Sequence, residues 1–473
     1  MFGFQYKLSI PRQLAKPKRL LLRYVAYQKA DTQKTAWDVQ LAREMDQSKK
    51  VHIGNRTDWG ENVPCGISVP DRRQHVYTIG QTGVGKSTLL KNMILQDVHN
   101  GDGVGLIDPH GQLADEVLDN IPSHRANHVV YLNLLDGSPI GLNLLHDVPP
   151  DKRHLVASGV VSIFKNFIWG GDTSKIKKSW GARLEYYLKA TVSTLLECQN
   201  TSLLCIQKML VDPIYREWVV KRIKDPAVRS FWIREFPNDV RLRETAISPI
   251  QNKVGQLTLV PHMRNTFGQI RRAIDARFMM DNKRIFLASL SKGILGEDNA
   301  NLTGAVLLSL FQLAAMSRAD IPENERRDFF LYVDEFHSFS TDSFASMLSE
   351  SRKHRLSLTL AHQYVAQLPD NVRDAVFGNV GTLVSFRVGE ADARVLSEHF
   401  GGDLKPKHFT DLSNHEARVK LLAGGEYGDP FIMETLPPFD FGYNKKESII
   451  KTSRQRYGTP RHIVEERIER WMS

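Results

Sequence analysis

The sequence has few cysteines and no long apolar run, and both shortages narrow the class of protein. Only three of the 473 residues are cysteine (Cys65, Cys198 and Cys205), and their spacing matches no metal motif, which suits a reducing compartment. No uninterrupted apolar stretch reaches the ~18 residues needed to cross a membrane. The best candidate, 302–316, is shorter and contains polar residues, which favours a buried helix. Because no secretory signal is visible either, we expect a cytoplasmic protein without an integral membrane segment.

Basic residues are plentiful and unevenly distributed. The net charge is +10 and the pI is near 9.3. The first 30 residues contain seven Lys or Arg and no acid, and residues 221–290 contain 14 basic and six acidic residues. A third cluster combines basic and aromatic side chains: Lys175, Lys177, Lys178 and Arg183 with Trp169, Trp180 and Tyr186. Any one cluster could be a solvated helix face, but together they favour a polyanionic partner such as DNA.

A glycine-rich loop in the first quarter of the chain is the most specific motif. Residues 80–87 read G-x-x-x-x-G-K-S, after an apolar strand-like run and before a helical segment. In this context the loop amides and the helix N-terminus surround a phosphate. Lys86 would reach the β- and γ-phosphates, and Ser87 would hold Mg²⁺. The motif predicts binding of ATP with Mg²⁺, through Gly80, Gly83, Gly85, Lys86, Ser87 and Thr88.

Two adjacent carboxylates end an apolar segment much later in the chain. Residues 328–333 are followed by Asp334 and Glu335. An Asp at the carboxyl end of a strand can order the Mg²⁺ shell, and the next Glu can take a proton from attacking water. A strand ending in solvated acids is the alternative reading, but the glycine loop favours a hydrolytic site.

Two further polar residues come after these carboxylates. Gln363 ends the strand-like run 356–361, where a glutamine can sense the γ-phosphate or orient the lytic water. A hydrogen-bonded strand-end amide is its simpler role. Arg352 precedes that strand and could reach a neighbouring subunit's nucleotide, although lone arginines are usually surface residues.

The order of apolar runs predicts an α/β fold with a mainly parallel sheet. Strands are expected at 75–80, 103–108, 128–132, 284–290, 329–334, 356–361 and 380–387. Helical patterns dominate the interval between the third and fourth runs. We therefore divide the chain into a basic N-terminal region (1–70), an ATPase core (71–150 and 281–438), an inserted helix-rich domain (151–280) and a C-terminal tail (439–473).

These motifs together resemble the FtsK/HerA superfamily of hexameric ATPases, and most closely the TraG/TraD-like coupling proteins of type IV secretion. The resemblance covers about residues 50–435 and includes the segments 78–88, 106–111, 331–335, 351–353 and 361–363. It implies a RecA-like P-loop NTPase fold with an inserted all-α domain, and a homohexamer. It also implies that Asp334 and Glu335 carry out hydrolysis and that Gln363 is the sensor. By the same resemblance, Arg352 is offered to a neighbour's ATP. Typical coupling proteins carry N-terminal transmembrane helices, and none is visible here.

The sequence therefore predicts an ATP-driven DNA translocase, serving conjugative transfer with relaxase or secretion components as partners. The setting could also be DNA processing or defence, as in HerA-like motors. A secretion-assembly ATPase that acts on protein is an alternative, and so is a nucleotide-switched scaffold with very slow turnover. An ABC-type transporter is disfavoured because no L-S-G-G-Q string occurs.

Overall fold

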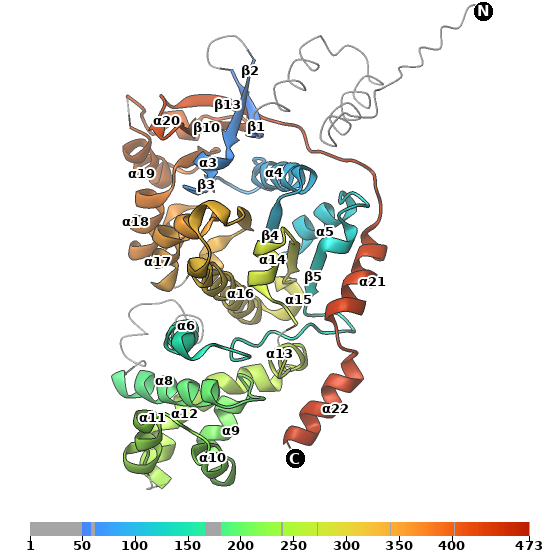
Figure 1. The fold of residues 1–473 in the computed structure, drawn as a ribbon. Helices are drawn as coiled ribbons and strands as arrows, with labels where there is room; N and C mark the ends of the chain where they lie inside the picture. Colours follow the sequence, from blue (N-terminus) through green and yellow to red (C-terminus); the bar gives the residue numbers. More distant parts are fainter. Residues whose placement is uncertain are drawn as a thin grey trace, which may run out of the picture.

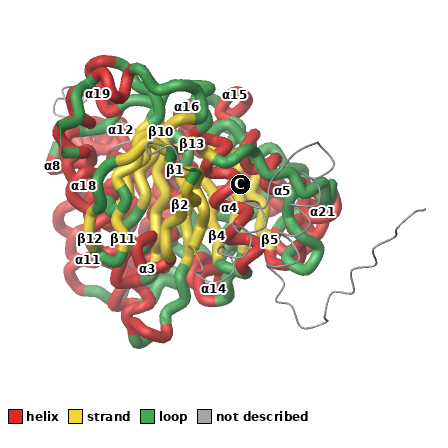
Figure 2. Tube along the Cα trace, turned by 90° about the horizontal axis from the view of Figure 1, so that it is seen from above, coloured by secondary structure: helices red, strands yellow, loops and turns green. Residues whose placement is uncertain are grey.

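A single large sheet forms the centre of the computed structural model, which describes residues 50–57, 62–165, 181–237, 240–271, 273–340, 342–401 and 403–472. The basic N-terminal segment and the predicted lysines at 175–178 lie outside these residues. The sheet has 11 strands in the order β2-β1-β13-β10-β9-β3-β8-β7-β4-β6-β5. Seen from above, its strands run through the middle of the molecule with helices on both sides (Figure 2).

One half of the sheet is parallel, as the sequence predicted. Neighbouring strands from β9 to β5 all run in the same direction. They are fully or almost fully buried, which explains why they appear in the sequence as continuous apolar runs. Their bounds are β3 Val76–Ile79, β4 Gly103–Asp108, β5 Val129–Asn133, β6 Ile285–Ser289, β7 Phe329–Val333, β8 Leu356–His362 and β9 Thr382–Ser385.

The other half is antiparallel and was not predicted. β10 pairs with β9, β13 with β10, β1 with β13 and β2 with β1. Buried and partly buried residues alternate along β10, so it shows no apolar run in the sequence. Since β1 and β2 belong to this sheet, the core begins before residue 71. The bounds are β1 Lys50–Arg56, β2 Val63–Ser68, β10 Glu416–Lys420 and β13 Phe431–Thr435; a separate small hairpin joins β11 Leu422–Ala423 to β12 Glu426–Tyr427.

Helices cover both faces of the sheet and create two apolar cores (Figure 1). One core contains side chains from α4, α5 and α21, and the other contains those of α14 and α16 to α20. Alternate residues of each strand enter opposite cores: Tyr77 and Ile79 enter one, and Val76 the other. The bounds are α3 Val69–Arg72, α4 Lys86–Asn100, α5 Gln112–Asp119, α14 Ala276–Asp281, α15 Lys292–Leu295, α16 Glu297–Ser317, α17 Asp342–Glu350, α18 Asp370–Asn379, α19 Glu390–Phe400 and α20 Lys407–Thr410.

A group of helices lies on one side of the sheet and its flanking helices, in the lower part of Figure 1. It occupies the interval between β5 and β6, as the sequence predicted for the inserted module. α6 contacts both α8 and the core helix α16, and so joins the two parts. The bounds are α6 Arg153–Ile163, α8 Ala182–Glu197, α9 Cys205–Val211, α10 Pro213–Val220, α11 Pro226–Ser230, α12 Val240–Leu259 and α13 Pro261–Phe267.

The C-terminal segment connects core and module. α21 (Lys446–Tyr457) lies on β5 and α5, and α22 (Arg461–Met472) contacts α13 (Figure 1). The packed core extends beyond the two prolines at 437–438, as the burial of Phe439 and Ile449 shows. α16 is the one helix in the described part of the chain long and apolar enough to span a membrane, and 72% of its apolar window is buried.

Candidate active site

Apart from Arg352, the predicted site residues meet at one edge of the parallel half-sheet. Ile79, just before the glycine loop, lies opposite His362 in the register, and Ile107 lies opposite Val333. Because parallel strands share an edge at their carboxyl ends, Gly80, Asp334 and Gln363 gather there despite their separation in sequence. Ligands of open α/β sheets bind at such an edge, so the topology itself places a binding site here.

The glycine loop runs from β3 into α4, as the motif requires. Gly85 has a φ of 117°, and a Cβ there would lie 3.1 Å from His415 Nδ1 and 3.3 Å from a ring carbon of Phe386. Glycine suits this position because the backbone has a positive φ and because a side chain would crowd His415 and Phe386. Gly83 also has a positive φ, of 81°. The loop therefore leads directly into the N-terminus of α4, where backbone amides favour an anion.

Lys86 is the first residue of α4 and is buried. Its Nζ donates hydrogen bonds to the carbonyl oxygens of Gly80 at 2.6 Å and Gln81 at 2.8 Å. Burial lowers the pKa of Lys86, and the negative charges of Glu335 and Asp334 oppose that shift. The ammonium thus sits between the loop and the carboxylates, within reach of a phosphate held by the loop.

Carboxylates suited to a divalent cation face this lysine. Burial raises the pKa of Asp334 to about 7, with the charges of Asp108 and Glu335 adding to the effect. Ser87 and Thr88 follow Lys86 in the first turn of α4, and Ser87 is exposed. Carboxylate and hydroxyl oxygens are ligands that Mg²⁺ takes together with phosphate oxygens, and a dication would favour ionised Asp334. The residues present therefore fit Mg²⁺ held by Ser87 and Asp334.

Glu335 and Gln363 are in direct contact. Gln363 Nε2 donates to Glu335 Oε1 at 2.9 Å. Glu335 is buried and has a φ of 46°, a left-handed conformation that is uncommon outside glycine. The strained backbone and the bonded amide hold the carboxylate at the site edge, where it can accept a proton from water.

Two residues of the site were not singled out from the sequence. Asp108 ends β4, and its carboxylate accepts hydrogen bonds from the amides of His110 at 2.9 Å and Ala114 at 3.0 Å. It therefore caps the start of α5 beside Asp334. His337 Nδ1 lies 3.4 Å from Glu335 Oε2. The position of Asp108 at a strand end was a usable signal, whereas nothing in the sequence pointed to His337.

The structure places Arg352 away from its own glycine loop. It precedes β8, while Gln363 follows that 7-residue strand, so the length of the strand, about 23 Å at ~3.3 Å per residue, lies between them. Neighbouring arginines on this opposite edge are engaged: Arg73 binds Asp328 at 2.8 Å, and Arg355 donates to the carbonyl of Glu323 at 3.4 Å. Arg352 is exposed.

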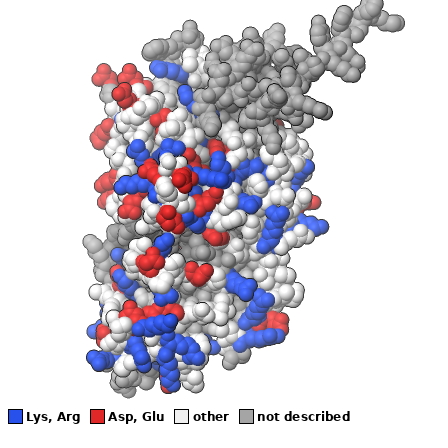
Figure 3. Space-filling model, in the orientation of Figure 1, with Lys and Arg blue, Asp and Glu red and all other residues white. Residues whose placement is uncertain are grey.

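The predicted basic segment 221–290 divides between two places. Its first part follows α10 and includes α11 and the helical turn at 231–235, at the lower end of the molecule where blue side chains gather in Figure 3. There Arg222 lies 3.9 Å above the ring of Trp218, which is half exposed. Its last part lies at the core sheet, where Arg277 bonds Asp320 and Lys283 bonds Asp102. Among the residues described at these two places, the first part combines exposed basic side chains with an exposed aromatic ring.

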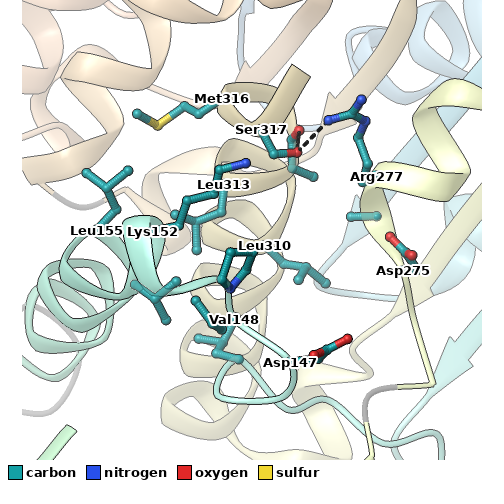
Figure 4. A pocket seen from close by; sticks show the side chains of 15 residues that line it. Asp147, Val148, Lys152, Leu155, Asp275, Arg277, Leu310, Leu313, Met316 and Ser317 are labelled. Carbon is teal, nitrogen blue, oxygen red and sulfur yellow. Dashed lines mark hydrogen bonds between the residues drawn. The ribbon is translucent and has the colours of Figure 1, made fainter. Parts of the chain in front are cut away.

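A cavity of about 340 Å³ lies elsewhere, between α6, α14 and α16 (Figure 4). Most of its lining is apolar, and Arg277 at its rim donates to Ser317 at 3.0 Å. None of the residues predicted for nucleotide binding lines it. No group of three or more His, Cys, Asp or Glu side chains able to hold a metal occurs within the described ranges. The edge of the sheet therefore remains the candidate active site.

Comparisons with known proteins agree with this architecture. A scan against protein-family models and a search of curated proteins gave no match. Among solved structures, the unbound conjugative coupling protein TrwBdeltaN70 has a TM-score of 0.60 at 16% identity, covering 80% of this chain and 87% of its own. TrwB with the GTP analogue GDPNP has a TM-score of 0.60 at 17% identity, covering 83% and 96%.

VirB4 of Thermoanaerobacter pseudethanolicus is also similar, with a TM-score of 0.52 at 16% identity over 82% of this chain and 96% of its own. Further TrwB structures contain an ATP analogue, or ADP with Mg²⁺. These likenesses establish the fold of a RecA-like P-loop ATPase with an inserted helical module. The similarity to conjugative coupling proteins that the sequence predicted is thus confirmed for the fold.

Proposed function

We propose that this protein is a Mg²⁺-dependent ATPase that moves DNA in conjugative, type IV secretion transfer. The observation that carries the proposal is the convergence of Lys86, Asp334, Glu335 and Gln363 at one edge of the sheet, in the fold shared with TrwB. Similar structures contain nucleotide analogues and ADP with Mg²⁺, which supports the same ligands here. A cytoplasmic location belongs to this proposal.

The chemistry follows from the positions of the side chains. The loop amides and Lys86 hold the β- and γ-phosphates, and Mg²⁺ on Ser87 and Asp334 would neutralise charge that develops during transfer. Glu335, held by Gln363 at 2.9 Å, accepts a proton from the attacking water. Most of the rate enhancement would come from positioning and electrostatic stabilisation, since phosphoryl transfer needs little covalent help from protein.

The surface of the helical module supports DNA as the cargo. The lower end of the helical module carries exposed basic residues beside the half-exposed Trp218, a combination suited to backbone contacts and base stacking. The exposed basic residues in this patch are Lys221, Arg222, Lys224, Arg229 and Arg234. We call this set the tip patch.

A ring of identical subunits fits the position of Arg352. In a head-to-tail ring each interface joins opposite faces of neighbouring subunits. Arg352 lies at the sheet edge opposite Lys86, so one subunit's Arg352 can approach the next subunit's nucleotide. We propose a homohexamer in which Arg352 acts on the neighbour's ATP.

The direct test is an ATPase assay of the purified protein with single-stranded DNA, duplex DNA and no DNA, together with its native mass. We expect Mg²⁺-dependent hydrolysis stimulated by DNA, with a hexameric species. Lys86→Ala is the matched control, because it removes the phosphate contact and should abolish turnover. A hydrolysis rate that neither single-stranded nor duplex DNA changes would contradict the translocase proposal.

A secretion-assembly ATPase acting on protein is a second candidate. The similarity to VirB4 favours it, since that fold match covers 82% of this chain. Turnover without DNA stimulation, together with stimulation by secretion components, would select this candidate. A nucleotide-switched scaffold would instead bind ATP tightly and hydrolyse it very slowly.

A further inference from the structure

A chain of polar side chains runs beneath the site from β3 to Glu335. Tyr77 Oη lies 2.6 Å from His362 Nε2, and His362 Nδ1 lies 3.3 Å from Gln367 Oε1. Gln367 Nε2 lies 3.2 Å from His337 Nε2, and His337 Nδ1 lies 3.4 Å from Glu335 Oε2. Both histidines and Gln367 are therefore linked to the candidate base, although none of the three was predicted to take part in hydrolysis.

The direction of each bond follows from one backbone amide. Tyr364 N donates to Gln367 Oε1 at 3.2 Å, so this oxygen is the acceptor and Gln367 Nε2 is the donor. His337 Nε2 then accepts from Gln367, and the Ser338 hydroxyl, 3.3 Å from the same nitrogen, can donate to it as well. This arrangement leaves the proton of the neutral ring on Nδ1, facing Glu335. By the same logic His362 donates from Nδ1 to Gln367 and accepts from Tyr77. The three hydrogen bonds all donate in the direction of Glu335, and the Nδ1–H of His337 then faces the carboxylate at 3.4 Å.

Burial favours the neutral form of both rings. Burial lowers the pKa of His362 to about 3. Burial also lowers the pKa of His337, while the charge of Glu335 opposes the shift. A neutral imidazole has one donor and one acceptor nitrogen, which is what the chain of contacts requires.

The chain ends at two facing atoms that have no hydrogen-bond partner within the described residues. These atoms are Glu335 Oε2 and His337 Nδ1. Both are buried, and they lie 3.4 Å apart. Glu335 Oε1 is already bonded to Gln363. A small movement of the imidazole would therefore give each carboxylate oxygen one side-chain donor and leave lone pairs for water.

We propose that His337 is a positioning residue for hydrolysis, whose Nδ1–H and the Gln363 amide together fix the orientation of the Glu335 carboxylate. The inference rests on the proposed ATPase function and adds a residue to it. The chain through Gln367 and His362 keeps His337 in the tautomer that can donate. His337 touches neither the nucleotide loop nor Asp334 in any contact described, so its effect passes through Glu335.

The test separates donation from packing by three substitutions of His337. The amide nitrogen of Asn lies near the place of imidazole Nδ1, whereas that of Gln lies near Nε2. We expect His337→Leu and His337→Gln to lower kcat by about 10- to 100-fold, the range for a lost hydrogen bond to a charged group. KM for ATP should stay within about twofold, because ground-state binding is untouched. His337→Asn should keep kcat within about threefold of the wild type.

Exposed His462 on α22 supplies the matched control, and His462→Leu should leave both constants unchanged. A wild-type kcat in His337→Leu overturns the inference. So does equal loss in the Leu and Asn variants with unchanged melting temperatures, because packing alone would then explain the effect. If the wild type itself shows no hydrolysis, it is the proposed function that fails, and this inference with it.

A second measurement does not depend on activity. The ¹⁵N shifts of the His337 ring in the full-length protein, assigned by comparison with His337→Asn, report which nitrogen carries the proton. We expect the neutral Nδ1–H form at neutral pH. An Nε2–H ring would overturn the inference even if the variants lose activity.

Discussion

Gln363 donates a hydrogen bond from Nε2 to Oε1 of Glu335 at 2.9 Å, across 28 positions in sequence. The contact joins the ends of β7 and β8, two neighbouring parallel strands. The residue proposed to sense the γ-phosphate and the residue proposed to activate water can thus act as one unit. Displacement of either strand end would alter the orientation of both side chains.

The first prediction concerns this pair. Glu335→Gln should bind ATP normally and lower turnover by about 10²- to 10⁴-fold, the usual contribution of a general base. Gln363→Leu should have a smaller effect of about 10- to 100-fold, since it removes a hydrogen bond to a charged group. Fluorescent nucleotide binding and steady-state hydrolysis measure the two effects separately. Wild-type turnover in Glu335→Gln would rule out its assignment as the base.

The second prediction is that Arg352 acts in trans. Arg352→Ala should bind ATP yet lose about 10³-fold in turnover, the lower range for an arginine finger. Rings mixed from Arg352→Ala and Glu335→Gln subunits should regain hydrolysis, because some interfaces then combine an intact Arg352 with an intact Glu335. Arg73→Ala is a control at the same edge. If mixed rings form and no ratio restores activity, Arg352 is not the finger and Arg355 becomes the next candidate.

The third prediction concerns the tip patch. Replacing Lys221, Arg222 and Lys224 with Gln should weaken DNA binding and flatten its dependence on salt, because fewer counterions are released. Three exposed basic residues at α19 and α20 serve as the control set: Arg394, Lys405 and Lys407. Their replacement should leave the salt slope nearly unchanged. Equal slopes for the two triple variants would place the DNA elsewhere.

The fourth prediction concerns stability beneath the site. Arg72 and Asp97 form a fully buried ion pair at 2.6 Å, and both contact the hydroxyl of Tyr332. Asp97→Ala should lower the free energy of unfolding by about 3–5 kcal/mol, because it leaves a buried charge without its partner. Urea unfolding measures the loss. A matched variant at the exposed pair Glu390–Arg394 should change stability little.

The fifth prediction is a pH dependence without nucleotide. The pKa of Asp334 is about 7 in the folded protein and near 3.9 in an unfolded chain. Between these values the folded state binds the proton more tightly, so stability should fall as pH rises from about 4 to 7. The loss should be a few kcal/mol at most, at about 1.4 kcal/mol per pKa unit.

Asp334→Asn should remove this part of the pH dependence, and Asp298→Asn, at an exposed position on α16, should not. Unfolding by urea at several pH values between 4.5 and 8 gives the comparison. Parallel curves for the wild type and Asp334→Asn would contradict the shift. Mg²⁺ with nucleotide should reduce the pH effect, because a dication favours the ionised carboxylate.

The sequence by itself determined the features that depend on neighbouring residues. The glycine loop must turn within a few positions, so its spacing is visible in the chain. Strands buried on both faces appear as continuous apolar runs, which is why β3 to β9 were predicted. β10 has one partly exposed face and alternating polarity, and no comparable run revealed it.

Only the tertiary structure decided which distant residues meet. Crossovers and burial on two faces set the strand order, and that order brings Glu335 to Gln363 while placing Arg352 at the opposite edge. The same packing neutralises Lys283 through Asp102, which a count of charges in the segment could not show. Contacts such as that of His337 with Glu335 depend on side-chain directions fixed by packing, and local sequence carries no record of them.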